Sequence, residues 1–145
     1  MGEVLCGCCK NNYIRQHKNI CPLCKKILGC GELKCDECEL DLRMVAVAGW
    51  KDGVLGRIVQ EYKYKSVRSA GDIMVELLDF AITEKLSGKE GWEEVVIVPL
   101  PTISRHVRER GFDHTLELAK KLARKRGWKV ETLLVRVKDT VQVGA

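Results

Sequence analysis

Apolar side chains recur along this chain at the spacing typical of amphipathic helices. Leu55, Ile58 and Tyr62 lie one turn apart, and a longer stretch over about 69–86 repeats the pattern. A third such segment follows Asp113, with apolar residues on one face and lysines and arginines on the other. The pattern predicts three helices, and Asp113 is a suitable N-cap for the last of them.

Short β-branched runs between these segments predict strands. We expect them over 44–48, 95–98 and 130–137, and the run at 95–98 is typical of a parallel strand covered on both faces. Because the last helix lies between the last two runs, the order is strand, helix, strand. The expected fold class is therefore α/β with a parallel sheet.

The cysteines form a separate module at the N-terminal end of the chain. All eight lie in the first 38 residues. Six form C-x-x-C pairs, which are Cys6 with Cys9, Cys21 with Cys24, and Cys35 with Cys38. Paired C-x-x-C turns suit the thiolates of a tetrahedral zinc site better than disulfides in a reducing compartment. We expect one zinc ion on Cys21, Cys24, Cys35 and Cys38.

The first pair, Cys6 and Cys9, has no obvious partner pair. It is either half of a site or part of an irregular second zinc site, in which Cys8 could replace Cys9 and Cys30 and His17 would contribute. A redox role for the C-x-x-C pairs is disfavoured because no thioredoxin-like strand precedes them. We place the domain boundary after this module, with zinc knuckles over 1–42 and an α/β domain over 43–145.

The segment 95–114 carries the pattern of an anion site. Pro99 and Pro101 end the expected strand, and the following loop holds three arginines close to the expected helix N-terminus at Asp113. These are Arg105, Arg108 and Arg110. Guanidinium groups and free helix N–H groups both favour phosphate, so we expect phosphate binding there.

Several ordered motifs together resemble the ComF family of competence-associated proteins. They are CPLCKK and CDEC, then GWKDGVLGRIVQEYKYKSVRSAGDIMVELL, then PLP, RGFDH and LELAKKLA, and finally LLVRVKDTVQVGA. The resemblance implies a phosphoribosyltransferase-like domain behind zinc knuckles, a role in DNA uptake, and partners such as a competence helicase. It also implies a phosphate-binding set consisting of Arg105, Arg108, Arg110, Gly111, Asp113 and His114.

One element of that family is not found in the sequence. Phosphoribosyltransferase-like relatives carry an acidic pair followed by a threonine–glycine turn that holds the ribose phosphate, and this chain stops at Ala145 without one. We therefore expect an incomplete, truncated domain that does not transfer phosphoribosyl groups. Magnesium is expected only in a full-length relative.

Charge and composition leave two ligand classes open. Basic residues between Pro99 and Trp128 outnumber acidic ones by five, which equals the formal net charge of the whole chain, +5. Such a field suits a phosphorylated ribose or single-stranded DNA. The alternative hypotheses are a non-enzymatic zinc module that binds single-stranded DNA or protein, and a non-functional copy. Neither a secretion signal nor an apolar membrane span is evident, so a cytoplasmic location is expected.

The basic positions also have ordinary structural interpretations. Residues 120–126 are expected to form mostly a solvated helix face, and Lys63-Tyr64-Lys65 a solvated helix end that could alternatively contact a nucleic-acid backbone.

Overall fold

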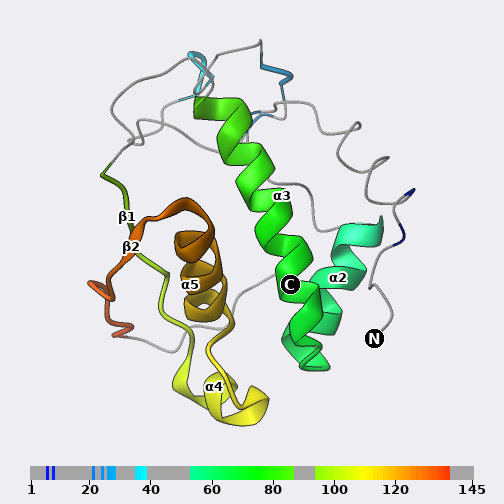
Figure 1. Ribbon diagram of the computed structural model, residues 1–145, viewed down its shortest axis with the longest axis vertical. Helices are drawn as coiled ribbons and strands as arrows, with labels where there is room; N and C mark the ends of the chain where they lie inside the picture. Colours follow the sequence, from blue (N-terminus) through cyan, green and yellow to red (C-terminus); the bar gives the residue numbers. More distant parts are fainter. Residues whose placement is uncertain are drawn as a thin grey trace.

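A computed structural model describes most of the chain beyond residue 52 and parts of the cysteine module. The described residues are Cys6, Cys8, Cys21, Cys24, 26–28, 35–38, 53–86 and 94–137. Their elements are α2 (Gly53–Tyr64), α3 (Arg68–Leu86), β1 (Val96–Ile97), α4 (Ser104–Arg110), α5 (His114–Arg126) and β2 (Lys129–Val130) (Figure 1). The strand expected over 44–48 lies outside the described residues.

The three helices predicted from periodicity are confirmed as α2, α3 and α5. Leu55, Ile58 and Tyr62 form the buried face of α2. The long helix α3 packs against both α2 and α5, and α5 lies beside the two strands (Figure 1). Within the described residues, no helix combines the length and the apolar character needed to cross a membrane.

The core where the helices meet is built around Tyr62. Its side chain is fully buried, and its ring contacts that of Phe112 at a centroid distance of 5.4 Å. Ile58 and Ala70 complete the cluster. Gly71 of α3 allows this close packing, because a Cβ there would lie 2.8 Å from Tyr62 Cε2. The core therefore ties α2 and α3 to the segment that leads into α5.

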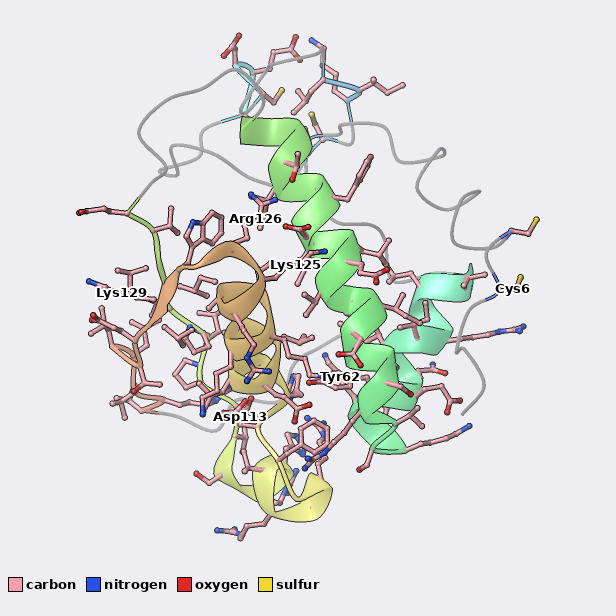
Figure 2. All side chains as sticks on the ribbon, in the orientation of Figure 1. Cys6, Tyr62, Asp113, Lys125, Arg126 and Lys129 are labelled. Atoms are coloured by element: carbon pink, nitrogen blue, oxygen red, sulfur yellow. The ribbon has the colours of Figure 1, made fainter. Side chains whose placement is uncertain are left out.

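Ion pairs join α3 to the basic face of α5. The Asp79 carboxylate accepts a hydrogen bond from Arg126 Nε at 2.5 Å and lies 2.8 Å from Lys125 Nζ (Figure 2). Lys121 Nζ lies 2.6 Å from Asp72 Oδ1. We expected the face over 120–126 to be mostly solvated. Three of its basic residues instead form ion pairs with carboxylates of α3.

The two strands form a parallel pair, as the strand–helix–strand pattern predicts. Val96 is in register with Lys129, and Ile97 with Val130. The predicted extents were wrong, however. Residues 131–137 have no regular secondary structure, because after the bond from Glu131 N to Ile97 O (3.0 Å) no further ladder bond forms among the described residues.

Burial of the strands also differs from expectation. Val96 is 43% exposed and Val135 is 84% exposed. The β-branched run at 95–98 predicted a strand that is covered on both faces. This prediction was wrong for Val96, whose side chain is partly exposed to solvent. The described fold is a mixed helical one with a small parallel sheet.

Candidate metal centre and anion site

The four cysteines predicted to bind zinc lie together. The sulfur atoms of Cys21, Cys24, Cys35 and Cys38 all lie within 4.8 Å of one another. Cys21 Sγ is 3.8 Å from Cys38 Sγ, and Cys24 Sγ is 3.7 Å from Cys35 Sγ. These separations are far longer than a disulfide bond of about 2.05 Å, so none of the four cysteines is disulfide-bonded.

The same separations fit a tetrahedral zinc ion. Four sulfurs bonded to zinc at about 2.3 Å stand about 3.8 Å apart along each edge of the tetrahedron. The two measured sulfur–sulfur distances match that edge. The cluster can therefore hold a metal ion such as zinc at the position that the sequence predicts.

Short backbone hydrogen bonds shape the two knuckles. Cys21 N donates to Lys26 O at 2.9 Å, which closes a loop around the first pair, and Cys38 N donates to Cys35 O at 3.3 Å, which makes the second pair a turn of four residues. Lys26 Nζ also lies 2.5 Å from Glu37 Oε1, which joins the knuckles to each other. Cys21 and Cys35 are buried whereas Cys24 is exposed. One side of the cluster is thus closed from solvent.

Crowding of the sulfurs opposes ionisation of Cys35 and Cys38 when no cation is present. The Cys24 sulfur, burial and the Cys21 sulfur raise the pKa of Cys38 to about 12. For Cys35, a backbone hydrogen bond from Glu37 lowers the pKa, but burial and the Cys24 sulfur outweigh it and the net shift is upward. A divalent cation would supply the positive charge that four thiolates need.

The structure leaves the other cysteine predictions open. Cys6 and Cys8 are exposed, and neither is disulfide-bonded. Cys9, Cys30 and His17, which a second site would require, lie outside the described residues. The half-site or second zinc site therefore stays a prediction.

The three arginines of the predicted anion loop lie instead on a short helix. Residues 104–110 form α4, which ends at Gly111, where φ is 75°. At 3.6 residues per turn, Arg105 and Arg108 share one side of α4 and Arg110 lies on another. Arg105 Nε lies 3.6 Å from Glu109 Oε1, and Arg108 is exposed. The expectation of a loop with converging arginines was wrong, because the residues after Pro101 form the helix α4.

The N-terminus of α5 is capped as predicted, and its cap is already negative. The Asp113 carboxylate accepts hydrogen bonds from the N–H groups of Thr115 and Leu116, at 3.0 and 3.2 Å. Thr102 Oγ1 also donates to it, at 2.8 Å. Burial raises the pKa of Asp113, but the hydrogen bonds lower it overall, and the largest of these effects comes from the Thr115 hydroxyl, which donates to the carboxylate at 2.8 Å. The first amides of α5 thus already have an anion, so phosphate would have to bind elsewhere.

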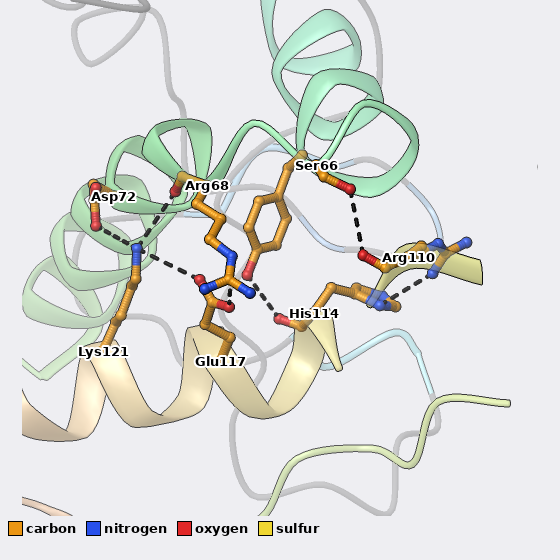
Figure 3. A network of polar contacts seen from close by, with 8 residues as sticks. Ser66, Arg68, Asp72, Arg110, His114, Glu117 and Lys121 are labelled. Carbon is orange, nitrogen blue, oxygen red and sulfur yellow. Dashed lines mark hydrogen bonds and ion pairs between the residues drawn. The ribbon is translucent and has the colours of Figure 1, made fainter. Parts of the chain in front are cut away.

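Arg110 lies beside this helix start and is held on two sides. Its Nη1 lies 3.2 Å from His114 Nδ1, and its guanidinium lies over the Tyr64 ring at 5.3 Å from the centroid. The chain around it is fixed by Ser66 Oγ, which donates to Arg110 O at 3.4 Å, and by Tyr62 Oη, which donates to His114 O at 3.2 Å (Figure 3). Arg110 and His114, both predicted site residues, are therefore neighbours.

The charge of His114 is set by these neighbours. Burial, Lys63 and Arg110 lower the pKa of His114 to about 4. The imidazole is therefore neutral at pH 7, and the positive charge at this point belongs to Arg110.

Sequence reasoning missed the residues from α2 and its junction with α3 that complete this site. Tyr64 was recognised only as part of a basic–aromatic segment, and Tyr62 only as a core position. Ser66 has a φ of 56°, a left-handed conformation that a serine gives no local signal for. Their role depends on a contact between segments more than forty residues apart.

Comparison with protein-family models, with curated proteins and with solved structures finds no match to this chain. The resemblance to the ComF family therefore stays a prediction.

Proposed function

We propose that this chain is a zinc-stabilised protein that binds the phosphate group of a phosphorylated ribose at Arg110, as a ComF-like, phosphoribosyltransferase-related protein would. Zinc orders the cysteine module, and α4 and α5 carry the phosphate site. The proposal concerns binding and contains no catalytic step. A role in DNA uptake is part of the same proposal, and its support is the motif resemblance.

The observation that carries the proposal is the state of the Arg110 side chain. Arg68 lies 3.9 Å from a carboxylate of Glu117, and Arg105 and Arg126 likewise have carboxylate partners. Arg110, in contrast, forms no ion pair with any carboxylate in the described part of the chain, and its contacts are a neutral imidazole and an aromatic ring. Its charge is oriented but not neutralised, which is what an anion-binding arginine requires.

Titration of ribose 5-phosphate and phosphoribosyl pyrophosphate by calorimetry tests the proposal. Arg110→Ala should weaken binding by about ten- to a hundredfold, which corresponds to one charged hydrogen-bonding group. Arg124→Ala is the matched control, since Arg124 is an exposed arginine on α5. Equal losses in the two variants would indicate diffuse charge and contradict a site at Arg110.

A second candidate function, binding of single-stranded DNA, is supported by Tyr64. Its side chain is 62% exposed, it lies between Lys63 and Lys65, and exposed aromatic rings beside cations stack on bases. An oligothymidine titration separates the two functions. Tight DNA binding that Tyr64→Ala abolishes, with no measurable affinity for ribose 5-phosphate, would favour the DNA function.

A further inference from the structure

We infer that His114 is a positioning residue that orients the Arg110 guanidinium toward a bound phosphate and does not itself contact the phosphate. The inference rests on the phosphate site proposed above. It assigns to His114 a role different from the direct ligand role that the motif resemblance implies.

The first step concerns which atom donates in the contact between the two side chains. Arg110 Nη1 and His114 Nδ1 are 3.2 Å apart, and a guanidinium can only donate a hydrogen bond. His114 Nδ1 must therefore be the acceptor, which places the imidazole proton on Nε2. The neutral ring thus acts on Arg110 through its lone pair.

The charged groups around His114 maintain this state. Lys63 from α2 and Arg110 and His106 from α4 all disfavour a protonated ring, while Asp113 at the start of α5 favours it. Burial adds to the effect of the cations. The imidazole consequently stays an acceptor at about pH 6 and above, where a phosphate monoester carries its second negative charge.

The second step concerns how firmly the pair is held. The carbonyl groups of both residues accept hydrogen bonds from side chains outside α4 and α5, from Ser66 and from the buried Tyr62 (Figure 3). The Tyr64 ring covers one face of the guanidinium. The hydrogen bond to His114 therefore acts on a guanidinium whose backbone and face are already fixed, so that it decides where the remaining N–H groups point.

Substitutions that keep or remove the acceptor test the inference. Asparagine places its amide near the position of Nδ1, whereas glutamine reaches the position of Nε2. We expect His114→Asn to bind ribose 5-phosphate within about threefold of the wild type, and His114→Gln and His114→Ala to lose about three- to tenfold, the net worth of one typical hydrogen bond. The reverse order, with glutamine active and asparagine inactive, would show that Nε2–H contacts the phosphate and overturn the inference. Thermal unfolding of each variant shows whether a loss comes from misfolding.

A measurement without ligand separates this inference from the proposed function. Two-bond ¹⁵N–¹H correlation spectra of the wild-type protein should show His114 as the neutral Nε2–H tautomer at pH 7 and still at pH 5. Arg110→Met should raise the pKa of His114, because it removes a neighbouring cation. An Nδ1–H tautomer, or protonation of the wild-type ring near pH 6.5, would refute the positioning role. Failure of the wild type to bind ribose 5-phosphate would refute the proposed function and leave the spectra as the test of the Arg110–His114 contact.

Discussion

Replacing Gly71 by alanine should destabilise the protein, although alanine is the better helix former. Gly71 lies in α3, where exchange of glycine for alanine normally stabilises a helix by about 1 kcal/mol. Here the added methyl group would meet the Tyr62 ring, with Cε2 at 2.8 Å and Cζ at 3.2 Å. The ring is fully buried and in contact with Phe112, so it cannot move without disturbing the core.

The balance of opposing contributions decides whether Gly71→Ala lowers or raises the free energy of unfolding. Overpacking a dense core by one methyl group costs about 1–3 kcal/mol. Displacement of the ring also weakens the hydrogen bond from Tyr62 Oη to His114 O, at a cost of about 0.5–1.5 kcal/mol. After the gain in helix propensity is subtracted, we expect a net loss of about 0.5–3.5 kcal/mol in the free energy of unfolding.

Urea unfolding followed by circular dichroism measures this loss directly. The control is Gly71→Ala in a Tyr62→Leu background, where the smaller side chain leaves room for the methyl group and the substitution should become stabilising. A Gly71→Ala protein more stable than the wild type would refute the packing described for Tyr62. Because Tyr62 also holds the His114 carbonyl, the single variant should bind ribose 5-phosphate more weakly as well.

Three further predictions concern the metal, a strained residue and a helix cap. X-ray absorption of the purified protein should show zinc with four sulfur neighbours at about 2.3 Å. Cys24→Ser should abolish tight zinc binding while Cys8→Ser leaves it unchanged, and nitrogen or oxygen neighbours in the spectrum would contradict the four-cysteine site. Ser66→Gly should change the free energy of unfolding by less than about 1 kcal/mol, measured in urea, because the strain relieved at this positive φ is offset by the lost hydrogen bond from Ser66 Oγ to Arg110 O. Asp113→Ala should lower the free energy of unfolding by about 1 kcal/mol at pH 6, since it removes the cap of α5. Because the folded pKa of Asp113 is lowered, its contribution is complete above the unfolded value of about 3.9 and is lost as the pH falls through the folded value, so the difference between the two proteins should shrink below about pH 4. A difference that grows on acidification would contradict this assignment.

Local patterns in the sequence determined the helices α2, α3 and α5 and the cysteine cluster. An amphipathic repeat fixes which face of α2 or α5 is buried. An aspartate caps a helix by accepting hydrogen bonds from backbone N–H groups within the next three residues, so its effect is also local. A C-x-x-C pair brings two sulfurs together through a turn of four residues, so the neighbourhood of Cys35 and Cys38 follows from spacing alone.

The tertiary structure alone decided the arrangement of the anion site and the length of the strands. A strand exists only where a neighbour supplies ladder bonds, so of the run at 130–137 only Val130 lies in a strand, together with the preceding Lys129. Among the three arginines, the sequence distinguishes Arg110 only as the one that precedes a glycine at the expected helix entrance. Its distinct state comes from Tyr64 and His114, which the packing of α2 against the start of α5 brings to the same point. Contacts between distant segments depend on how whole helices pack. This packing is determined by many core residues together, so no local sequence pattern predicts it.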